Sequence, residues 1–523
     1  MKWKWRKKQL KAADAKLNED VWGLIANEID TYGNLYSLCL VSHLCHQATT
    51  PQLYRLVRLD LSHQSHFRCL RQIIRPDSQY LKLVRFLFIK GAEQAGRVPI
   101  SELCAALPRF SNLQGIDCKG SQTLSETVSD MSAVPHPLYT VLKHLASSRL
   151  TYFGFSPTIA SQYYEGFKAD LLAMMTRNTG LLTLRILEER ALGLSKTYPE
   201  MLPYFQNNSL PKLQSLTIVT TDGLTLFHGP ELEIWGGQGG FDDMTCLAIR
   251  NAWYFPIFAR TAPKLKTLGY MPHAFAGADS AALRLDAAGL AAPLWPRLET
   301  LHYLPHCHHR TTLICFCQAA PLGLLGRLPH ITKLKISRPW LGPIISDYPR
   351  VMPTKEDIRA IQNLCPNLKE LRMDVAPPGR RPYPRWPVDV LEALCDFQQP
   401  IKLLIYFHVY TPKLVSLLND RLVYRDIFED MVKKRTSRGL PCQSPYEVGF
   451  KVVRSWEKMK DHCDTPDYKF GVIDGGGVSF ERRNGLVPLL VQEKKEYVKK
   501  RVAKTKGQIS RAYKRNASKP MHL

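Results

Sequence analysis

The stretch Leu210-Pro211-Lys212-Leu213-Gln214-Ser215-Leu216-Thr217-Ile218 carries the pattern that decides the fold. An apolar residue is followed by two free positions, a second apolar residue, one free position and a third apolar residue. The same spacing returns about every thirty residues, a period typical of repeat proteins. The clearest copies are Leu213/Leu216/Ile218, Met244/Leu247/Ile249, Leu265/Leu268/Tyr270, Leu298/Leu301/Tyr303, Ile331/Leu334/Ile336 and Leu368/Leu371/Met373.

A proline stands two residues before the first apolar position in most of these copies. Proline cannot continue a helix and makes its predecessor extended, so it ends one helix just before a strand begins. The pattern is therefore interpreted as the strand of a leucine-rich repeat. These prolines are Pro211, Pro263, Pro296, Pro329 and Pro366.

Weaker copies of the triplet extend the array to residues 56–415. The segments between triplets have helical apolar spacing, as in Asp357–Cys365. One strand–helix unit cannot bury its leucines alone, so the units must stack. The weaker copies are Leu56/Leu59/Leu61, Leu83/Phe86/Phe88, Leu113/Ile116, Leu150/Phe153/Phe155, Leu181/Leu184/Ile186 and Ile401/Leu404/Tyr406.

The expected fold class is α/β, a solenoid with parallel strands on a concave face and helices on a convex face. The free strand positions would line the concave face, where a protein substrate could bind. Each of these side chains could equally be ordinary surface polarity. The candidate substrate-binding residues are Thr217, Arg250, His302, Lys333, Lys335 and Arg372.

Helices are expected ahead of the repeats, in residues 15–60. The first carries Leu17, Val21 and Ile25 at helical spacing, the second follows Asn34 as a helix cap, and the third has Pro51 in its first turn. Alternatively, these helices only cover the apolar end of the solenoid.

Three strings within these helices carry a family resemblance: Leu17-Asn18-Glu19-Asp20-Val21-Trp22-Gly23-Leu24-Ile25, Leu38-Cys39-Leu40-Val41-Ser42, and Ala48-Thr49-Thr50-Pro51-Gln52-Leu53-Tyr54-Arg55. Together they resemble the F-box of fungal F-box proteins. The chain departs from the usual motif at Asn18, where a proline is common, and at His43, Leu44 and Cys45.

The resemblance implies docking on a Skp-family adaptor that joins a cullin ligase core. The chain would then be a non-catalytic substrate-recognition subunit of a ubiquitin ligase, its repeats binding an unknown protein. The implied adaptor-binding residues are Leu17, Asn18, Val21, Ile25, Leu38, Val41 and Ser42, with Val21, Ile25 and Val41 as the buried anchors.

The formal net charge of +25 is concentrated toward the two ends, residues 1–14 and 493–523. Basic ends attract polyanions, but they can also be solvated tails without a partner. The alternative function is therefore a ligase-independent scaffold, nuclear and associated with nucleic acid through its basic termini. The expected location is the cytoplasm, the nucleus or both, because no apolar run suits a membrane span of roughly 18 residues or a signal peptide.

The remaining chemistry-bearing motifs are few. The thirteen cysteines are scattered, which fits reduced thiols. A cluster of histidines and cysteines from His302 to Cys317 matches no common zinc spacing, so no metal, cofactor or catalytic residue is predicted; a zinc hydrolase is the third class considered. In residues 416–492, expected to cap the repeats, alternating apolar residues around Asp474–Gly477 predict a β-hairpin.

Overall fold

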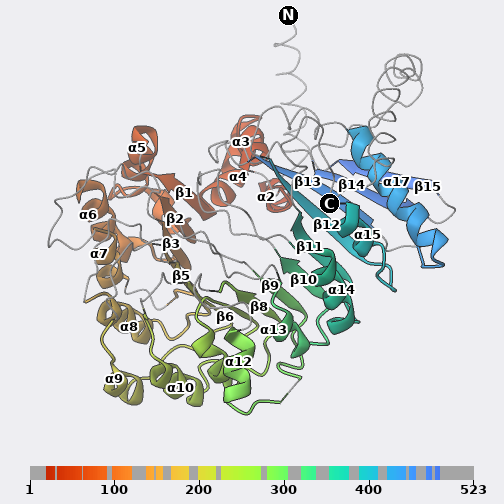
Figure 1. Ribbon diagram of the computed structural model, residues 1–523. Helices are drawn as coiled ribbons and strands as arrows, with labels where there is room; N and C mark the ends of the chain where they lie inside the picture. The colour runs from red at the N-terminus through yellow and green to blue at the C-terminus, as the bar shows by residue number, and fades with distance from the viewer. Residues whose placement is uncertain are drawn as a thin grey trace, which may run out of the picture. The chain divides into compact units, whose positions relative to one another are not determined.

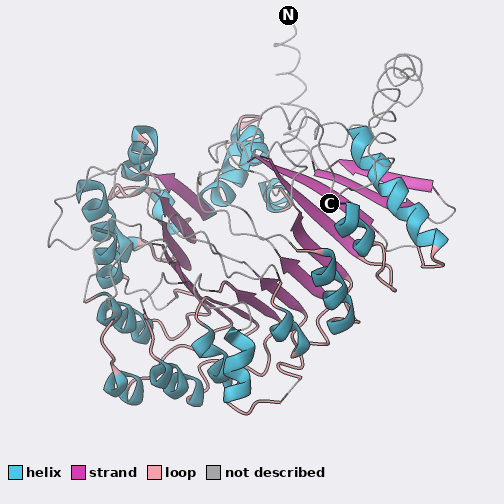
Figure 2. Cartoon of the chain, in the orientation of Figure 1, coloured by secondary structure: helices cyan, strands magenta, loops and turns pink. Residues whose placement is uncertain are grey.

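The computed structural model describes residues 19–29, 32–61, 63–90, 97–119, 137–145, 149–156, 166–187, 198–219, 225–272, 280–291, 293–303, 320–336, 353–375, 388–409, 421–442, 447–454, 467–473 and 477–482. The chain divides into two compact units, residues 1–301 and 302–523. Strands and helices alternate in both units (Figure 2).

The first unit opens with helices and continues with parallel strands. Its strands pair in chain order, each with the next, from β1 to β8. Sequential order is what a stacked repeat produces. The strands are β1 (Leu56–Asp60), β2 (Phe86–Lys90), β3 (Gly115–Lys119), β4 (Tyr152–Ser156), β5 (Thr183–Leu187), β6 (Ser215–Val219), β7 (Cys246–Ile249) and β8 (Thr267–Tyr270).

A helix or short helical turn lies between successive strands of this unit. Figure 1 shows α5 to α10 following one another along one side of the row of strands. These elements are α2 (Glu19–Asn27), α3 (Tyr32–Cys39), α4 (His43–Arg55), α5 (Gln64–Ile73), η1 (Gln79–Lys82), α6 (Arg97–Ala106), η2 (Leu107–Arg109), α7 (Pro137–His144), α8 (Phe167–Arg177), α9 (Leu202–Asn207), α10 (Gly229–Gly237), η3 (Ala252–Tyr254), α11 (Phe255–Thr261) and α12 (Ser280–Ala287).

The second unit repeats the arrangement and ends differently. β9 (Thr300–Tyr303) spans the boundary between the units, β10 to β13 pair in parallel, and β13 to β15 pair in antiparallel fashion. The elements are β10 (Lys333–Ile336), β11 (Glu370–Val375), β12 (Lys402–Val409), β13 (Glu447–Arg454), β14 (Asp467–Ile473), β15 (Gly477–Arg482), α13 (Leu322–Gly326), α14 (Lys355–Leu364), α15 (Val388–Leu394) and α17 (Arg421–Ser437).

The predicted leucine triplets form the core. In each of the clearest copies, all members are at most 2% exposed. The parallel α/β repeat architecture is thereby confirmed. The apolar side chains alternate along each strand with more exposed ones, as in β6, where Leu216 and Ile218 are buried between half-buried neighbours.

Successive repeats of the first unit share one backbone signature. At the entry to each strand from β3 to β9, one carbonyl accepts hydrogen bonds from two consecutive N–H groups of the next repeat; for example, the Gln114 carbonyl accepts from Thr151 and Tyr152 at 2.7 and 3.0 Å. In the second unit, the Thr332 carbonyl does the same. The accepting residues of the first unit are Arg85, Gln114, Thr151, Leu182, Gln214, Thr245 and Lys266.

Two of the weaker triplets were predicted in the wrong register. The predicted Leu83/Phe86/Phe88 is in fact Val84/Leu87/Ile89, each at most 1% exposed, whereas Phe86 and Phe88 lie on the opposite face of β2. Leu403 and Ile405 are likewise buried in place of Leu404 and Tyr406. These strands are apolar on both faces, so alternation does not distinguish the two registers.

The N-terminal helices occur as predicted, but their ends differ. α3 begins at Tyr32, so Asn34 lies inside it instead of capping it. α4 begins after Ser42, whose hydroxyl accepts a hydrogen bond from the Cys45 N–H at 3.1 Å, and Pro51 therefore falls inside the helix. A hydroxyl able to cap the first turn explains the earlier start.

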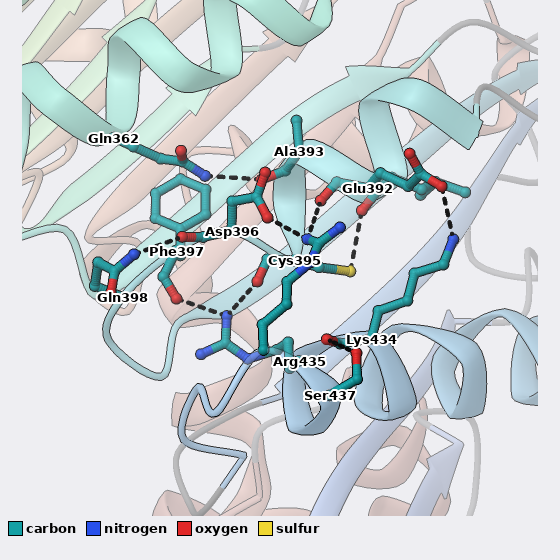
Figure 3. Close-up of polar contacts among 12 residues, drawn as sticks. Gln362, Glu392, Ala393, Cys395, Asp396, Phe397, Gln398, Lys434, Arg435 and Ser437 are labelled. Carbon is teal, nitrogen blue, oxygen red and sulfur yellow. Dashed lines mark hydrogen bonds and ion pairs between the residues drawn. The ribbon is translucent and has the colours of Figure 1, made fainter.

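The C-terminal part confirms the predicted hairpin, since β14 and β15 pair with Ile473 opposite Gly477. Helix α17 is held by Arg435, which is fully buried and donates to the carbonyls of Cys395 and Phe397 at 3.0 and 2.7 Å (Figure 3). Arg435 also donates to the Pro441 carbonyl at 2.8 Å. These bonds fix α17 to the segment that follows α15.

Candidate binding face of the sheet

Each strand has one face that packs against the helices and one face that the described helices leave uncovered. Side chains on the uncovered face are those that alternate with the buried leucines, such as Arg185 on β5 and Thr217 on β6, which are in register with each other. Parallel strands place equivalent residues in rows across the sheet. Within each unit, the uncovered face is therefore the surface on which polar side chains of neighbouring strands lie next to one another.

The structure brings some of the predicted residues together on this face. Lys335 on β10 lies directly opposite Arg372 on β11, and Lys333 lies opposite Glu370. His302 on β9 is close enough for both Lys335 and Arg372 to influence its titration. His302, Lys335 and Arg372 therefore form a basic cluster.

Three predicted residues lie outside the basic cluster, and one of them, Lys333, is on the same strand as Lys335. Thr217 is half-buried on β6, between Arg185 and Ala248 of the adjacent strands. Arg250 follows the end of β7 and is only 5% exposed, so its side chain is part of the interior. Neither of these residues belongs to the basic cluster.

The basic cluster holds positive charge at close range. Burial lowers the pKa of Lys335, and the neighbouring Arg372 lowers it further, while Asp374 opposes the change. Burial and the same two cations lower the pKa of His302. Like charges opposite each other on adjacent strands repel, so an anionic group placed here would relieve the repulsion.

Carboxylates border the basic cluster and limit its net charge. Glu370 forms an ion pair with Arg372 on its own strand, and the next pair of strands adds a bridge between Lys402 and Glu447 at 3.0 Å. This mixture of partly compensated charges can recognise polar groups of another macromolecule by complementary pairing. Among the residues discussed here, no nucleophilic side chain lies beside a group that could act as a general base.

A second constellation on the first unit was missed by the sequence analysis. Asp117 on β3 accepts hydrogen bonds from the Tyr152 hydroxyl at 2.7 Å and from Arg185 Nη1 at 2.9 Å. Burial raises the pKa of Tyr152 to about 12, and the hydrogen bond to Asp117 adds to this shift. The missed signal was the register of β2, which places Phe86 and Phe88 on the same face as Asp117.

The described residues of the N-terminal helices place the predicted adaptor-binding side chains as follows. Val21, Leu38, Val41 and Ser42 are half-buried, and Ile25 is 38% exposed. Ser42 caps α4, so part of its role is structural. Leu17 and Asn18 lie outside the described residues.

Several predictions on metals, termini and membranes fall partly or wholly outside what the structure describes. His302 is the only described member of the predicted histidine–cysteine cluster, and the basic ends 1–14 and 493–523 are also outside the described residues. Within the described ranges, no group of three or more His, Cys, Asp or Glu side chains could hold a metal ion. None of the described helices combines the length and apolar character that crossing a membrane requires. Neither a scan against protein-family models nor a search of curated proteins finds a match to this chain.

Proposed function

We propose that this protein is a non-catalytic substrate-recognition subunit of a Skp-cullin-F-box ubiquitin ligase. In this proposal α2 and α3 dock on the Skp-family adaptor, and the uncovered face of the sheet binds a protein substrate. The ligase core would supply all covalent chemistry. The observation that carries the proposal is the distribution of exposed apolar side chains.

Half of the exposed large apolar side chains among the described residues lie in or directly after the first two helices. Leu24, Ile25, Tyr36 and Leu40 are 65%, 38%, 55% and 71% exposed, and all lie between residues 24 and 40. The other exposed large apolar side chains in the described part of the chain, Leu182, Trp253, Leu283 and Val388, are far apart in the sequence. A concentration of exposed apolar groups is typical of a surface that another protein covers.

The third helix, α4, has a structural role that differs from the binding role proposed for α2 and α3. Both α2 and α3 pack on α4, and α4 packs on β1. Thr49 of α4 is fully buried, accepts or donates a 2.7 Å bond with the Cys39 thiol, and donates to the Cys45 carbonyl at 2.6 Å. α4 thus packs on the first strand, as the capping alternative requires, and the exposed apolar side chains of α2 and α3 are the ones assigned to the adaptor in this proposal.

The test is co-elution of the full chain with a Skp-family adaptor in size-exclusion chromatography. Leu24→Asp combined with Ile25→Asp should weaken the complex by more than about tenfold, because a charge in an apolar interface costs several kcal/mol. The matched control is Leu283→Asp, since Leu283 is 67% exposed on α12. Co-elution should survive in the control.

Two outcomes contradict the proposal. One is the absence of a complex between the wild-type chain and the adaptor. The other is equal retention of the complex in Leu24→Asp/Ile25→Asp and in Leu283→Asp. In either case α2 to α4 would serve only to cover the first strand.

A further inference from the structure

The uncovered face of β2 to β5 carries a compact group of charged and aromatic side chains. We call it the Asp117 patch; it comprises Phe86, Phe88, Asp117, Tyr152 and Arg185. Phe86 and Phe88 lie on β2, Asp117 on β3, Tyr152 on β4 and Arg185 on β5. The register of the strands places Phe88, Asp117, Gly154 and Arg185 in one row.

Glycines make this arrangement possible. A Cβ atom on Gly154 would come within 2.7 Å of the Asp117 carboxyl carbon, so the carboxylate lies directly over β4 and reaches Arg185 on β5. A Cβ atom on Gly115 would approach the Phe86 ring to 2.5 Å. At such distances, a side chain at either position would force the Asp117 carboxylate or the Phe86 ring to shift.

The Asp117 carboxylate is held at some cost in stability. It is 6% exposed, and its Oδ2 atom accepts from both Tyr152 and Arg185. Its Oδ1 atom is buried without a hydrogen-bond partner. A buried acceptor left unpaired costs about 1–3 kcal/mol, so stability alone does not explain this carboxylate.

Arg185 keeps most of its hydrogen-bonding capacity. Its side chain is 36% exposed, its bond to Asp117 uses one N–H of Nη1, and its guanidinium also interacts with the Tyr152 hydroxyl. A guanidinium has five N–H donors in a planar fork that fits a carboxylate with two bonds. Asp117 therefore acts as a positioning residue that holds Arg185 in place for a second, incoming carboxylate.

Two aromatic rings, those of Phe88 and Tyr152, form the apolar part of the Asp117 patch. The rings of Phe88 and Tyr152 are 6.4 Å apart between centroids. The guanidinium carbon of Arg58, on β1, lies 5.6 Å from the centre of the Phe88 ring. Tilted rings next to arginine offer a site for an aromatic or aliphatic side chain of a partner.

The net charge of the surrounding strand positions indicates which charge a binding partner should carry. Among the described side chains on the uncovered face of β1 to β5, the cations Arg58, Lys90 and Arg185 outnumber the carboxylates of Asp60 and Asp117. Lys90 is paired with Asp60 at 3.5 Å. The surplus is positive, so charge complementarity favours an acidic partner.

From this geometry we infer that the Asp117 patch binds an acidic peptide segment that also carries aromatic side chains. A Glu or Asp carboxylate of the segment pairs with Arg185, and a neighbouring ring packs on Phe88 and Tyr152. The inference deepens the proposed function by naming the chemistry of the substrate. It does not depend on the adaptor, so binding is measured on the full chain alone.

The probe is a fluorescein-labelled peptide of six Glu-Tyr repeats, compared with otherwise identical Gln-Tyr and Lys-Tyr peptides by fluorescence anisotropy. The Glu-Tyr peptide should bind at least about tenfold more tightly than the other two. Arg185→Met should remove most of this advantage, because it deletes the guanidinium and keeps the aliphatic stem. Rising salt should weaken binding to the wild type more than to the variant.

Two further variants separate positioning from general damage. Asp117→Asn should lower affinity for the Glu-Tyr peptide severalfold and leave the weak Gln-Tyr binding unchanged, a selectivity that unfolding would not produce. Arg260→Met is the matched control, since Arg260 on α11 also pairs with a carboxylate at 2.9 Å, that of Glu233. Its affinities should match those of the wild type.

The inference is overturned by any of three results. These are no binding of the Glu-Tyr peptide, equal affinity for all three peptides, and equal affinity of Arg185→Met and wild type. A thymidine oligonucleotide that displaces the peptide and binds more tightly, with the same dependence on Arg185, would assign the patch to nucleic acid instead. Adaptor co-elution would be unaffected in each case, so the two proposals fail separately.

Discussion

Lys168 and Arg435 lie in the interior, whereas Arg185 and Lys335 lie on the uncovered face of the sheet. The Lys168 ammonium is fully buried and bonds both Glu231 oxygens, at 2.7 and 2.6 Å, and the Pro199 carbonyl at 2.8 Å. Arg435 is surrounded by carbonyl oxygens. On the sheet face, by contrast, Arg185 bonds a single carboxylate oxygen and Lys335 faces another cation.

The difference separates charge used for folding from charge left for binding. An interior cation must satisfy its donors within the chain, because desolvation otherwise costs several kcal/mol. A cation on the uncovered face can keep unused N–H donors with little loss of stability, because water accepts hydrogen bonds from them in the absence of a binding partner. The number of internal partners is therefore a guide to which cations bind other molecules.

The largest effect is expected from Lys168→Met. It would leave the Glu231 carboxylate buried with only the N–H groups of Met201 and His228, at 2.6 and 2.8 Å. The free energy of unfolding should fall by about 3–5 kcal/mol, measured by urea denaturation. Lys168→Met with Glu231→Leu should recover part of the loss.

Lys264→Met is the control for this variant. Lys264 pairs with Asp243 at 2.6 Å, and both side chains are about half exposed, at 48% and 54%. Its removal should cost less than about 1 kcal/mol. Equal losses at Lys168 and Lys264 would contradict the distinction between interior and surface charge.

A smaller loss, about 3 kcal/mol, is expected from Arg435→Met. The variant would leave the carbonyls of Cys395, Phe397 and Pro441 without their donor, but these acceptors are neutral and carry no uncompensated charge. Urea denaturation monitored near α17 would measure it. Arg438→Met, which removes a partly exposed pair with Asp396, should cost less than about 1 kcal/mol.

On the sheet face, Gly154→Ala should cost about 1–3 kcal/mol, because its methyl group would collide with the Asp117 carboxylate. Gly23→Ala is the opposite case. Gly23 lies in α2 with no atom within 4 Å of its added Cβ, so alanine should stabilise the helix by roughly 0.5–1 kcal/mol. Thermal unfolding of both variants measures the contrast, and a neutral Gly154→Ala would show that the carboxylate moves freely.

The smallest effect concerns the pH dependence at His302. Because the folded state lowers the pKa of His302, the unfolded chain takes up this proton first as the pH falls. Stability should therefore decline as the pH drops through the ordinary titration range of histidine and level off below the folded pKa. His302→Gln should reduce the difference in urea midpoint between pH 7.5 and pH 5.

Lys335→Met sharpens this measurement. It removes one of the cations that lower the pKa of His302, so the pH dependence of a chain with His302 intact should become weaker. An unchanged pH dependence in both variants would show that the basic cluster does not govern this titration.

The repeat architecture could be predicted because its signal is local and recurrent. Leu213, Leu216 and Ile218 announce a buried strand by spacing alone, and the preceding proline marks where the helix ends. The hairpin of β14 and β15 was predicted for the same reason, since alternation and a glycine turn are neighbours in sequence. Such features need no knowledge of distant residues.

The polar constellations could not be predicted, because their members meet only through the fold. Lys168 and Glu231 are 63 positions apart, and Asp117 and Arg185 are 68 apart. Nothing in the sequence near Asp117 indicates that Gly154 leaves room for its carboxylate. Of the predicted substrate-binding residues, His302, Lys335 and Arg372 were the ones brought together, because they occupy strands that follow one another in the repeat.

The paired hydrogen bonds between successive repeats affect how the number of repeats can change in evolution. The Thr151 carbonyl accepts hydrogen bonds from the N–H groups of Leu182 and Thr183, just as the Leu182 carbonyl accepts them from Gln214 and Ser215. Excising one whole repeat would therefore present an equivalent pair of donors to the same acceptor. Recognition groups on the sheet could thus move apart or together in evolution only in steps of one strand spacing, about 4.8 Å.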